Sequence, residues 1–81
     1  MNIPVRLSAG LAPTVGSSRL LVNLAENATV ADLLEYLRVQ HPALAVKMHT
    51  AVPIIAGRPA ASSERLVEAQ EVALLLPVAG G

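Results

Sequence analysis

The residues of this sequence with the clearest chemical use are the last two, Gly80 and Gly81. Glycine has no Cβ, so a terminal diglycine adopts backbone angles closed to other residues and can enter a channel too narrow for side chains. Four residues from Val78 extend at most roughly 14 Å, enough to place the Gly81 carboxylate inside the active site of another protein. The alternative interpretation is a frayed chain end or a linker.

The other side chains that could take part in a reaction lack the spacing that catalysis or metal binding needs. His41 and His49 are eight positions apart with no cysteine or acidic cluster nearby, so a helix-end histidine and a loop histidine are the better interpretations. No nucleophile-elbow motif surrounds any of the serines, which are Ser8, Ser17, Ser18, Ser62 and Ser63. We interpret these serines as cap and turn residues.

Composition limits the partners and reactions that are open to the chain. Its 81 residues predict one domain with a small core, and Tyr36 is the only aromatic residue, so that core must be aliphatic. Six Lys plus Arg balance six Asp plus Glu without a basic run, which disfavours nucleic acid as a partner. Cysteine is absent, which rules out disulfides, thiolate metal sites and a persulfide on this chain's own side chains.

The first residues and the longest apolar run favour a cytoplasmic protein. Residues 1–9 contain Arg6 within an alternating pattern, in place of the basic segment and long apolar core of a signal peptide. The run from Val72 to Ala79 is shorter than the roughly 20 helical residues that cross a bilayer. We therefore expect a cytoplasmic chain that binds no membrane.

Apolar residues alternate along several segments, as they do in strands with one buried face. The first two predicted strands cover residues 3–7 and 19–24, and a long loop with Gly and Pro joins them into a hairpin. Residues 52–56 and 58–61 predict two short strands on either side of Gly57.

One amphipathic helix is predicted between the second and third strands. Thr29 is suited to its N-cap, and Asp32 lies three positions on, in the reciprocal capping position. Apolar residues then recur at helical spacing: Val30, Leu33, Leu34 and Leu37. Pro42 disfavours helical geometry at the residue before it, so the helix should end near Gln40, with a looser segment continuing to Met48.

The last predicted strand leads into the tail. By strand parity Leu75 points opposite to Leu74 and Leu76, which puts an apolar side chain on the outer face of the sheet. A scattered surface leucine is the alternative interpretation. We predict a partner-docking patch made of Leu75, Pro77, Val78 and Ala79.

Three stretches carry a resemblance to a known family. They are residues 5–11 (VRLSAGL), 28–34 (ATVADLL) and the ending 71–81 (EVALLLPVAGG). Together they resemble the MoaD/ThiS family of ubiquitin-like sulfur carriers, and within it the small subunit of molybdopterin synthase. The resemblance implies an α+β fold of the β-grasp (ubiquitin-like) type, with a mixed sheet packed on one main helix. It divides the chain into a domain over 1–77 and a flexible diglycine tail over 78–81.

The resemblance also implies what the tail does. Gly81 becomes an acyl adenylate and then a thiocarboxylate that donates sulfur in molybdopterin (molybdenum cofactor) biosynthesis, and Gly80 gives the tail its flexibility. The implied partners are an adenylating enzyme of the ubiquitin-activating type, the large subunit of molybdopterin synthase and a sulfur donor protein. The chain itself is a non-catalytic, sulfur-donating subunit without a bound cofactor, because ATP and Mg are used by the activating partner.

Three alternatives stay open. A related carrier would send sulfur to thiamine, cysteine or transfer RNA through the same carboxylate. A ubiquitin-like modifier would form isopeptide bonds through Gly81, although a single lysine, Lys47, weakly disfavours a polymerising modifier. The third alternative is a β-grasp interaction domain with an inert tail.

Some positions depart from the family pattern. Residues 68–71 (EAQE) replace the usual Asp-Gly-Asp type of turn, so Ala69 is expected to take backbone angles better suited to glycine. Pro4 lies in a strand that this fold flanks on both sides, so we expect a local bulge or an altered strand start. Leucines at 74–76 replace the bulky aromatic residues of many relatives, which predicts a different fit to partners.

Overall fold

The elements of the chain follow one another in a mixed α+β order. The structure, a computed structural model, describes residues 1–77. Its strands and helices are β1 (Asn2–Leu7), α1 (Ala12–Val15), β2 (Arg19–Asn23), α2 (Val30–Gln40), α3 (Pro42–Lys47), a 3-10 helix (Met48–Thr50), β3 (Val52–Ile55), β4 (Arg58–Pro59) and β5 (Val72–Leu75). Within this described part, no helix has the length and apolarity that a bilayer crossing needs.

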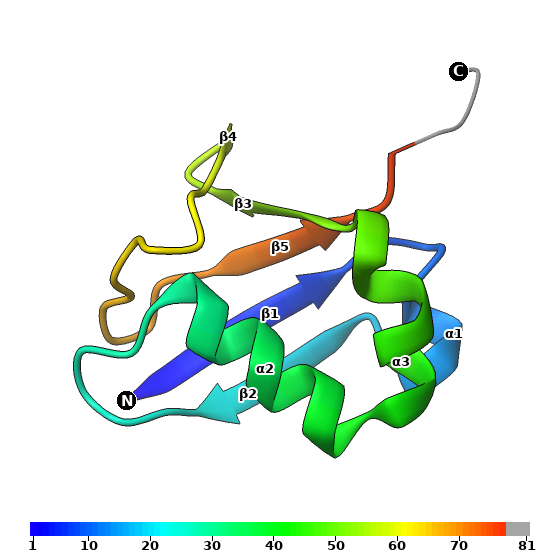
Figure 1. Ribbon diagram of the computed structural model, residues 1–81, viewed down its shortest axis with the longest axis horizontal. Helices are drawn as coiled ribbons and strands as arrows, with labels where there is room; N and C mark the ends of the chain where they lie inside the picture. The colour runs from blue at the N-terminus through cyan, green and yellow to red at the C-terminus, as the bar shows by residue number, and fades with distance from the viewer. Residues whose placement is uncertain (78–81) are drawn as a thin grey trace.

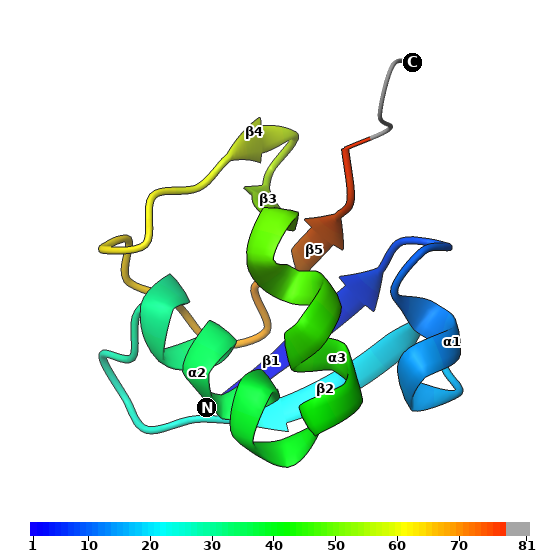
Figure 2. The same cartoon turned by 45° about the vertical axis from the view of Figure 1, so that its right-hand side comes forward.

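The strands form one mixed sheet in the order β2-β1-β5-β3-β4. β1 pairs with β2 as the predicted antiparallel hairpin, whose loop contains the short helix α1. β5 lies between β1, to which it is parallel, and β3, to which it is antiparallel. Figures 1 and 2 show α2 and α3 on the same face of this sheet, and α1 at the edge where β1 and β5 end. Within residues 1–77, the opposite face of the sheet is therefore left without a helical cover.

Helix α2 begins and ends where the sequence predicted. The Thr29 hydroxyl accepts a hydrogen bond from the Asp32 N–H, and the Asp32 carboxylate accepts one from the Thr29 N–H, which completes a capping box. The N–H of Val30 donates to the carbonyl of Glu64 at 2.9 Å, so the loop before β5 also satisfies a free donor at the start of the helix. His41 has φ −133° and ends α2 after Gln40.

The looser segment expected up to Met48 is wrong, because residues Pro42–Lys47 form helix α3. Pro42 occupies the first turn of α3, where proline costs nothing because its missing N–H would have had no partner in the helix. Leu44 and Met48 then turn into the core and are 0% and 5% exposed. The proline thus separates two helices, where the sequence prediction had only one.

The core lies between the helices and the inner face of the sheet, and it is aliphatic as the composition required. Nine fully buried side chains are the largest of this core: Ile3, Val5, Leu11, Val30, Leu33, Leu37, Leu44, Val72 and Leu74. No polar or charged residue among residues 1–77 is buried. Burial of aliphatic surface therefore holds the domain together.

Ala69 has the backbone geometry that the sequence predicted for it. Its φ is 65°, in the left-handed region that glycine adopts without cost, and its N–H donates to the carbonyl of Asn2 at 2.9 Å. This hydrogen bond ties the loop before β5 to the start of β1. The tight turn is therefore kept although its usual glycine is absent.

Pro4 neither bulges β1 nor shifts its start, so that expectation is wrong. β1 pairs with β2 without interruption from Asn2 to Arg6. Backbone groups of even-numbered residues in β1 face away from β2, as the carbonyl of Asn2 does, and on that side the ladder with β5 begins only at Val5. The nitrogen of Pro4 thus points to a place where no ladder hydrogen bond is needed.

A bidentate ion pair links β4 to the loop whose carbonyls cap the start of α2. Arg58 Nη1 and Nη2 donate to Glu64 Oε1 and Oε2 at 2.9 and 2.8 Å. The hydrogen bonds from Arg58, more than its charge, lower the pKa of Glu64 below its ordinary 4.5, against a smaller opposing effect of burial. Because the folded-state pKa is lowered, the pair stabilises the fold above the ordinary pKa, and this contribution is lost as the pH falls through the lowered value.

We expect Glu64→Gln to flatten the acid side of the stability profile. The thermal unfolding midpoint of the native chain should fall more steeply below pH 4.5 than that of the variant, because the amide that replaces the carboxylate has no proton to gain. Glu26→Gln is the matched control, since Glu26 is exposed and has no ion pair within residues 1–77. Equal acid dependence of native and Glu64→Gln chains would contradict this account.

Candidate functional site

The site is organised around the end of β5, the last element before the predicted tail. β1 and β5 run parallel, so their C-terminal ends lie at the same end of the sheet, and α1 lies next to that end (Figure 2). Leu76 is half-buried and packs against the core, and Pro77 is exposed. The predicted site residues Val78, Ala79, Gly80 and Gly81 lie outside the described residues.

Leu75 lies on the outer face of the sheet, opposite to Val72 and Leu74, as strand parity predicted. It is 42% exposed, whereas Val72 and Leu74 are completely buried. In the register of β3 and β5, Leu75 is paired with Val52, and Ala73 is paired with Ile54. We call the residues Val52, Ile54, Ala73 and Leu75 the outer patch. It is apolar and lies on the face that no helix of the described chain covers.

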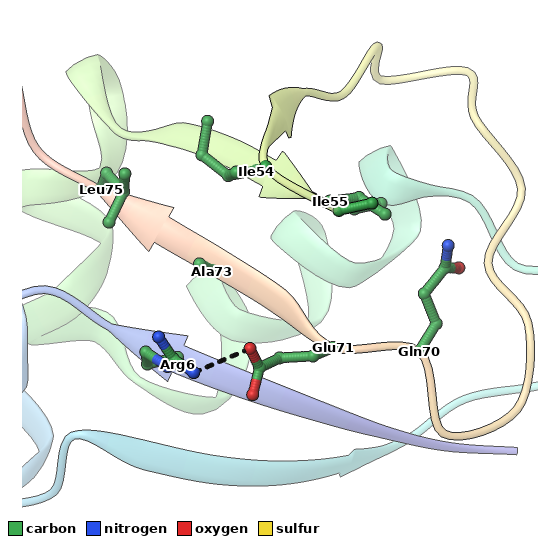
Figure 3. Close-up of a pocket in the computed structure, with 9 residues that line it drawn as sticks. Arg6, Ile54, Ile55, Gln70, Glu71, Ala73 and Leu75 are labelled. Carbon is green, nitrogen blue, oxygen red and sulfur yellow. Dashed lines mark hydrogen bonds and ion pairs between the residues drawn. The ribbon is translucent and has the colours of Figure 1, made fainter.

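A hollow of about 540 Å³ opens beside the outer patch. Figure 3 shows Ile54, Ala73 and Leu75 along it, with Arg6 and Glu71 on the side of β1. Arg6 Nη2 and Glu71 Oε1 are 3.0 Å apart, and both side chains are about half exposed, so this pair adds little to stability. Its effect is to give an apolar surface one charged border.

Charged side chains flank Arg6 on the outer face of the sheet. Arg19 on β2 is directly opposite Arg6 in the register, which places two positive charges side by side on the outer face. Like charges in that position repel each other, and Glu71 on the other side of β1 attracts the Arg6 guanidinium. The outer face therefore carries the charged side chains of Arg6, Arg19 and Glu71 beside the apolar side chains of β5 and β3.

Local secondary structure accounts for His41, His49 and Ser17. His41 ends α2, and His49 is exposed in the 3-10 helix. Residues 1–77 contain no group of three or more potential metal-binding side chains. Ser17 bonds only to Arg19, two residues away, as a turn residue does.

Ser8 and Gly10 are the positions that sequence reasoning missed. Ser8 begins a turn as predicted, since its carbonyl accepts the N–H of Leu11, but its hydroxyl also accepts a hydrogen bond from the N–H of Leu76 at 3.3 Å. The space that a Cβ on Gly10 would fill is occupied by the side chain of Leu76. Both contacts join residues more than sixty positions apart, so no local sequence pattern predicts them.

These features define a ubiquitin-like β-grasp protein: a mixed sheet wraps helices on one face and ends in a strand that leads to the chain's last residues. The predicted fold class is confirmed. The chain belongs to the ThiS family, whose model matches residues 5–81. This places it among the ubiquitin-like sulfur carriers of the ThiS/MoaD type, whose members generally work with an adenylating enzyme and a partner subunit.

Solved structures similar to this chain include three with informative names. SAMP1 from Haloferax volcanii is 31% identical, with a TM-score of 0.89 and complete coverage of both chains. A putative molybdopterin converting factor, subunit 1, from Pyrococcus furiosus is 21% identical over 96% of this chain and 99% of its own, with a TM-score of 0.88. A Caldiarchaeum subterraneum ubiquitin is 22% identical over 100% and 98%, with a TM-score of 0.67. The last two show likeness of fold alone. No curated protein matches the chain.

Proposed function

We propose that this chain is a sulfur carrier whose Gly81 carboxylate is adenylated by a partner enzyme, converted to a thiocarboxylate and used to supply sulfur for molybdopterin. The observation that carries the proposal is the family match, which extends through Gly80 and Gly81 on a domain whose last strand leads to them. The ending 77–81 (PVAGG) and the long loop after the first strand favour the molybdopterin branch over carriers for thiamine, cysteine or transfer RNA.

The chemistry that we propose needs a partner at each step, because this chain has no cysteine and no phosphate-binding loop. A carboxylate oxygen of Gly81 attacks the α-phosphate of ATP, which releases pyrophosphate and leaves an acyl adenylate. A sulfide equivalent then attacks the carbonyl carbon, and AMP leaves with one former carboxylate oxygen. The product has sulfur in place of that oxygen, with no net oxidation or reduction when the donor is sulfide. ATP and Mg are bound by the adenylating enzyme in this scheme.

The experiment that tests the proposal measures the intact mass of the chain after incubation with an adenylating enzyme, Mg, ATP and sulfide. We expect the mass change of one oxygen replaced by one sulfur, and no change when ATP is omitted. Transfer of that sulfur to the pterin precursor on a molybdopterin synthase large subunit then tests the pathway. An unchanged mass with an enzyme that loads another ThiS-family chain would contradict the carrier function.

A second candidate function is protein modification, which the 31% identity to SAMP1 favours, since a second Haloferax volcanii match is named a small archaeal modifier protein. In this case a lysine amine of another protein attacks the adenylated carbonyl of Gly81, so that an isopeptide bond forms and AMP leaves. Conjugates of higher mass in cell extract that disappear on deletion of Gly81 would support this function. The two functions share the activation step and differ in what attacks the activated carbonyl.

We also propose that the outer patch, together with Pro77, Val78 and Ala79, docks the activating partner. Leu75→Asp should lower the affinity for that enzyme roughly tenfold or more, because a charge would be buried in an apolar contact. Leu21→Asp is the matched control: Leu21 is also an exposed strand leucine, 70% accessible, but it lies on β2 at the far edge of the sheet. Titration calorimetry of both variants checks this, and equal losses would contradict docking at β5.

A further inference from the structure

The chain loses its regular sheet pairing at Ser8, and the way it does so involves the exit of β5. The Ser8 N–H donates to the carbonyl of Leu74 at 3.0 Å, which continues the parallel ladder one step beyond β1. In a regular ladder the Ser8 carbonyl would next accept the N–H of Leu76. That carbonyl instead accepts from Leu11 and Ala12, both at 2.9 Å, and so forms the turn that leads into α1.

The hydroxyl of Ser8 takes the place of its own carbonyl. Ser8 Oγ accepts the N–H of Leu76 at 3.3 Å in a partly buried position. Ser8 therefore forms hydrogen bonds with Leu74 of β5 and with Leu76, the residue after β5. Its backbone carbonyl is meanwhile used in the turn before α1. Alanine at this position would leave the Leu76 N–H without this acceptor.

Gly10 contacts the side chain of the same residue, Leu76. A Cβ built on Gly10 would lie 2.7 Å from Leu76 Cδ1 and 3.7 Å from its Cγ, and the shorter distance is closer than real Cβ contacts allow. The Leu76 side chain therefore occupies the space that a Cβ at position 10 would fill, and a larger residue there requires Leu76 to shift. Since the contacting atom is a side-chain end, a methyl at Gly10 would move Leu76 before it disturbed the core.

From these contacts we infer that Ser8 and Gly10 are positioning residues that fix the direction in which the chain leaves the domain at Leu76. Pro77 extends this control, because proline restricts the residue before it to extended geometry and fixes its own φ. Five residues lead from Leu76 to Gly81 and span at most roughly 18 Å, so the place and direction of the exit at Leu76 limit the region that the carboxylate can reach. This inference rests on the proposed function of Gly81.

The inference is tested with Ser8→Ala, with Ser8→Thr, which keeps the hydroxyl, and with Ser63→Ala as control. Ser63 is exposed, and no side-chain hydrogen bond is formed by it within the described part of the chain. In Ser8→Ala, amide hydrogen exchange at Leu76 should become roughly fivefold faster, while exchange at Leu74 is unchanged. Ser8→Thr and Ser63→Ala should behave like the native chain. An unchanged Leu76 exchange rate in Ser8→Ala would overturn the inference.

Loading by the adenylating enzyme gives the functional readout. Ser8→Ala and Gly10→Ala should lower kcat for thiocarboxylate formation roughly tenfold and raise KM by a smaller factor, because the outer patch is untouched, whereas the delivery of the carboxylate depends on the exit at Leu76. Native kcat in both variants would overturn the inference and leave the carrier function standing. If the native chain itself is never loaded, the carrier function fails, and Leu76 exchange alone supports or overturns the contact.

Discussion

Deleting Gly81 is expected to reduce thiocarboxylate formation by a factor of about 100 or more. The deletion leaves a carboxylate on Gly80, but it withdraws that group by roughly 3.5 Å along an extended chain. Reacting atoms need to be within about 3.5 Å of each other, and a misplacement of about 1 Å can already cost a factor of 100. Initial rates of mass change with a fixed amount of adenylating enzyme measure the effect.

A second tail variant separates length from shape. Gly81→Ala keeps the carboxylate at its native distance and adds one methyl group, so a loss in this variant reports a channel too narrow for a side chain. Thermal unfolding midpoints equal to that of the native chain confirm that the domain is intact. Loading of the deletion variant at the native rate would show that Gly81 is not the sulfur-bearing residue.

Leu33→Ala is expected to lower the free energy of unfolding by about 2–5 kcal/mol. Leu33 is completely buried on the core face of α2, between the helices and the sheet. Its removal leaves a cavity among aliphatic neighbours, and a close-packed core relaxes only partly into such a space. Small domains have about 5–15 kcal/mol of stability in total, so this loss is a large fraction.

Urea denaturation of the native and variant chains measures this loss. Leu21→Ala is the control, because Leu21 is exposed, and its removal should change the free energy of unfolding by at most about 0.5 kcal/mol. The dependence of the free energy on urea should be the same for all three chains. Similar losses for Leu33 and Leu21 would mean that the core is not where the structure places it.

The fold could be predicted where local patterns agree with the tertiary structure. The capping pair of Thr29 and Asp32 and the alternation in β1 and β5 depend on near neighbours, and both are confirmed. The strain at Ala69 was also predictable, since a tight turn needs positive φ whichever residue occupies it. Local signals failed at Pro42, where one residue type ends one helix and suits the first turn of the next.

The candidate site could be predicted only in part for the same reason. The outward direction of Leu75 follows from the period of a strand, and the structure places it there. Its neighbours Val52 and Ile54 come from a strand whose register the sequence does not state. The contact of Ser8 with Leu76 joins positions 68 apart and arises because the Ser8 carbonyl is used elsewhere. Such a substitution of one acceptor for another is visible only in three dimensions.

The central position of β5 has a consequence for biosynthesis. The strand that joins β1 to β3 is the last strand along residues 1–77, so a nascent chain without it has two unpaired strand edges in the middle of its sheet. Pairing between β1 and β5 closes a long loop, which is the slow kind of contact in folding. The hairpin of β1 and β2 can form early, but the sheet closes only after β5 has been made. If the outer patch docks a partner as proposed above, a nascent chain without β5 does not yet present that surface, because Ala73 and Leu75 are part of it.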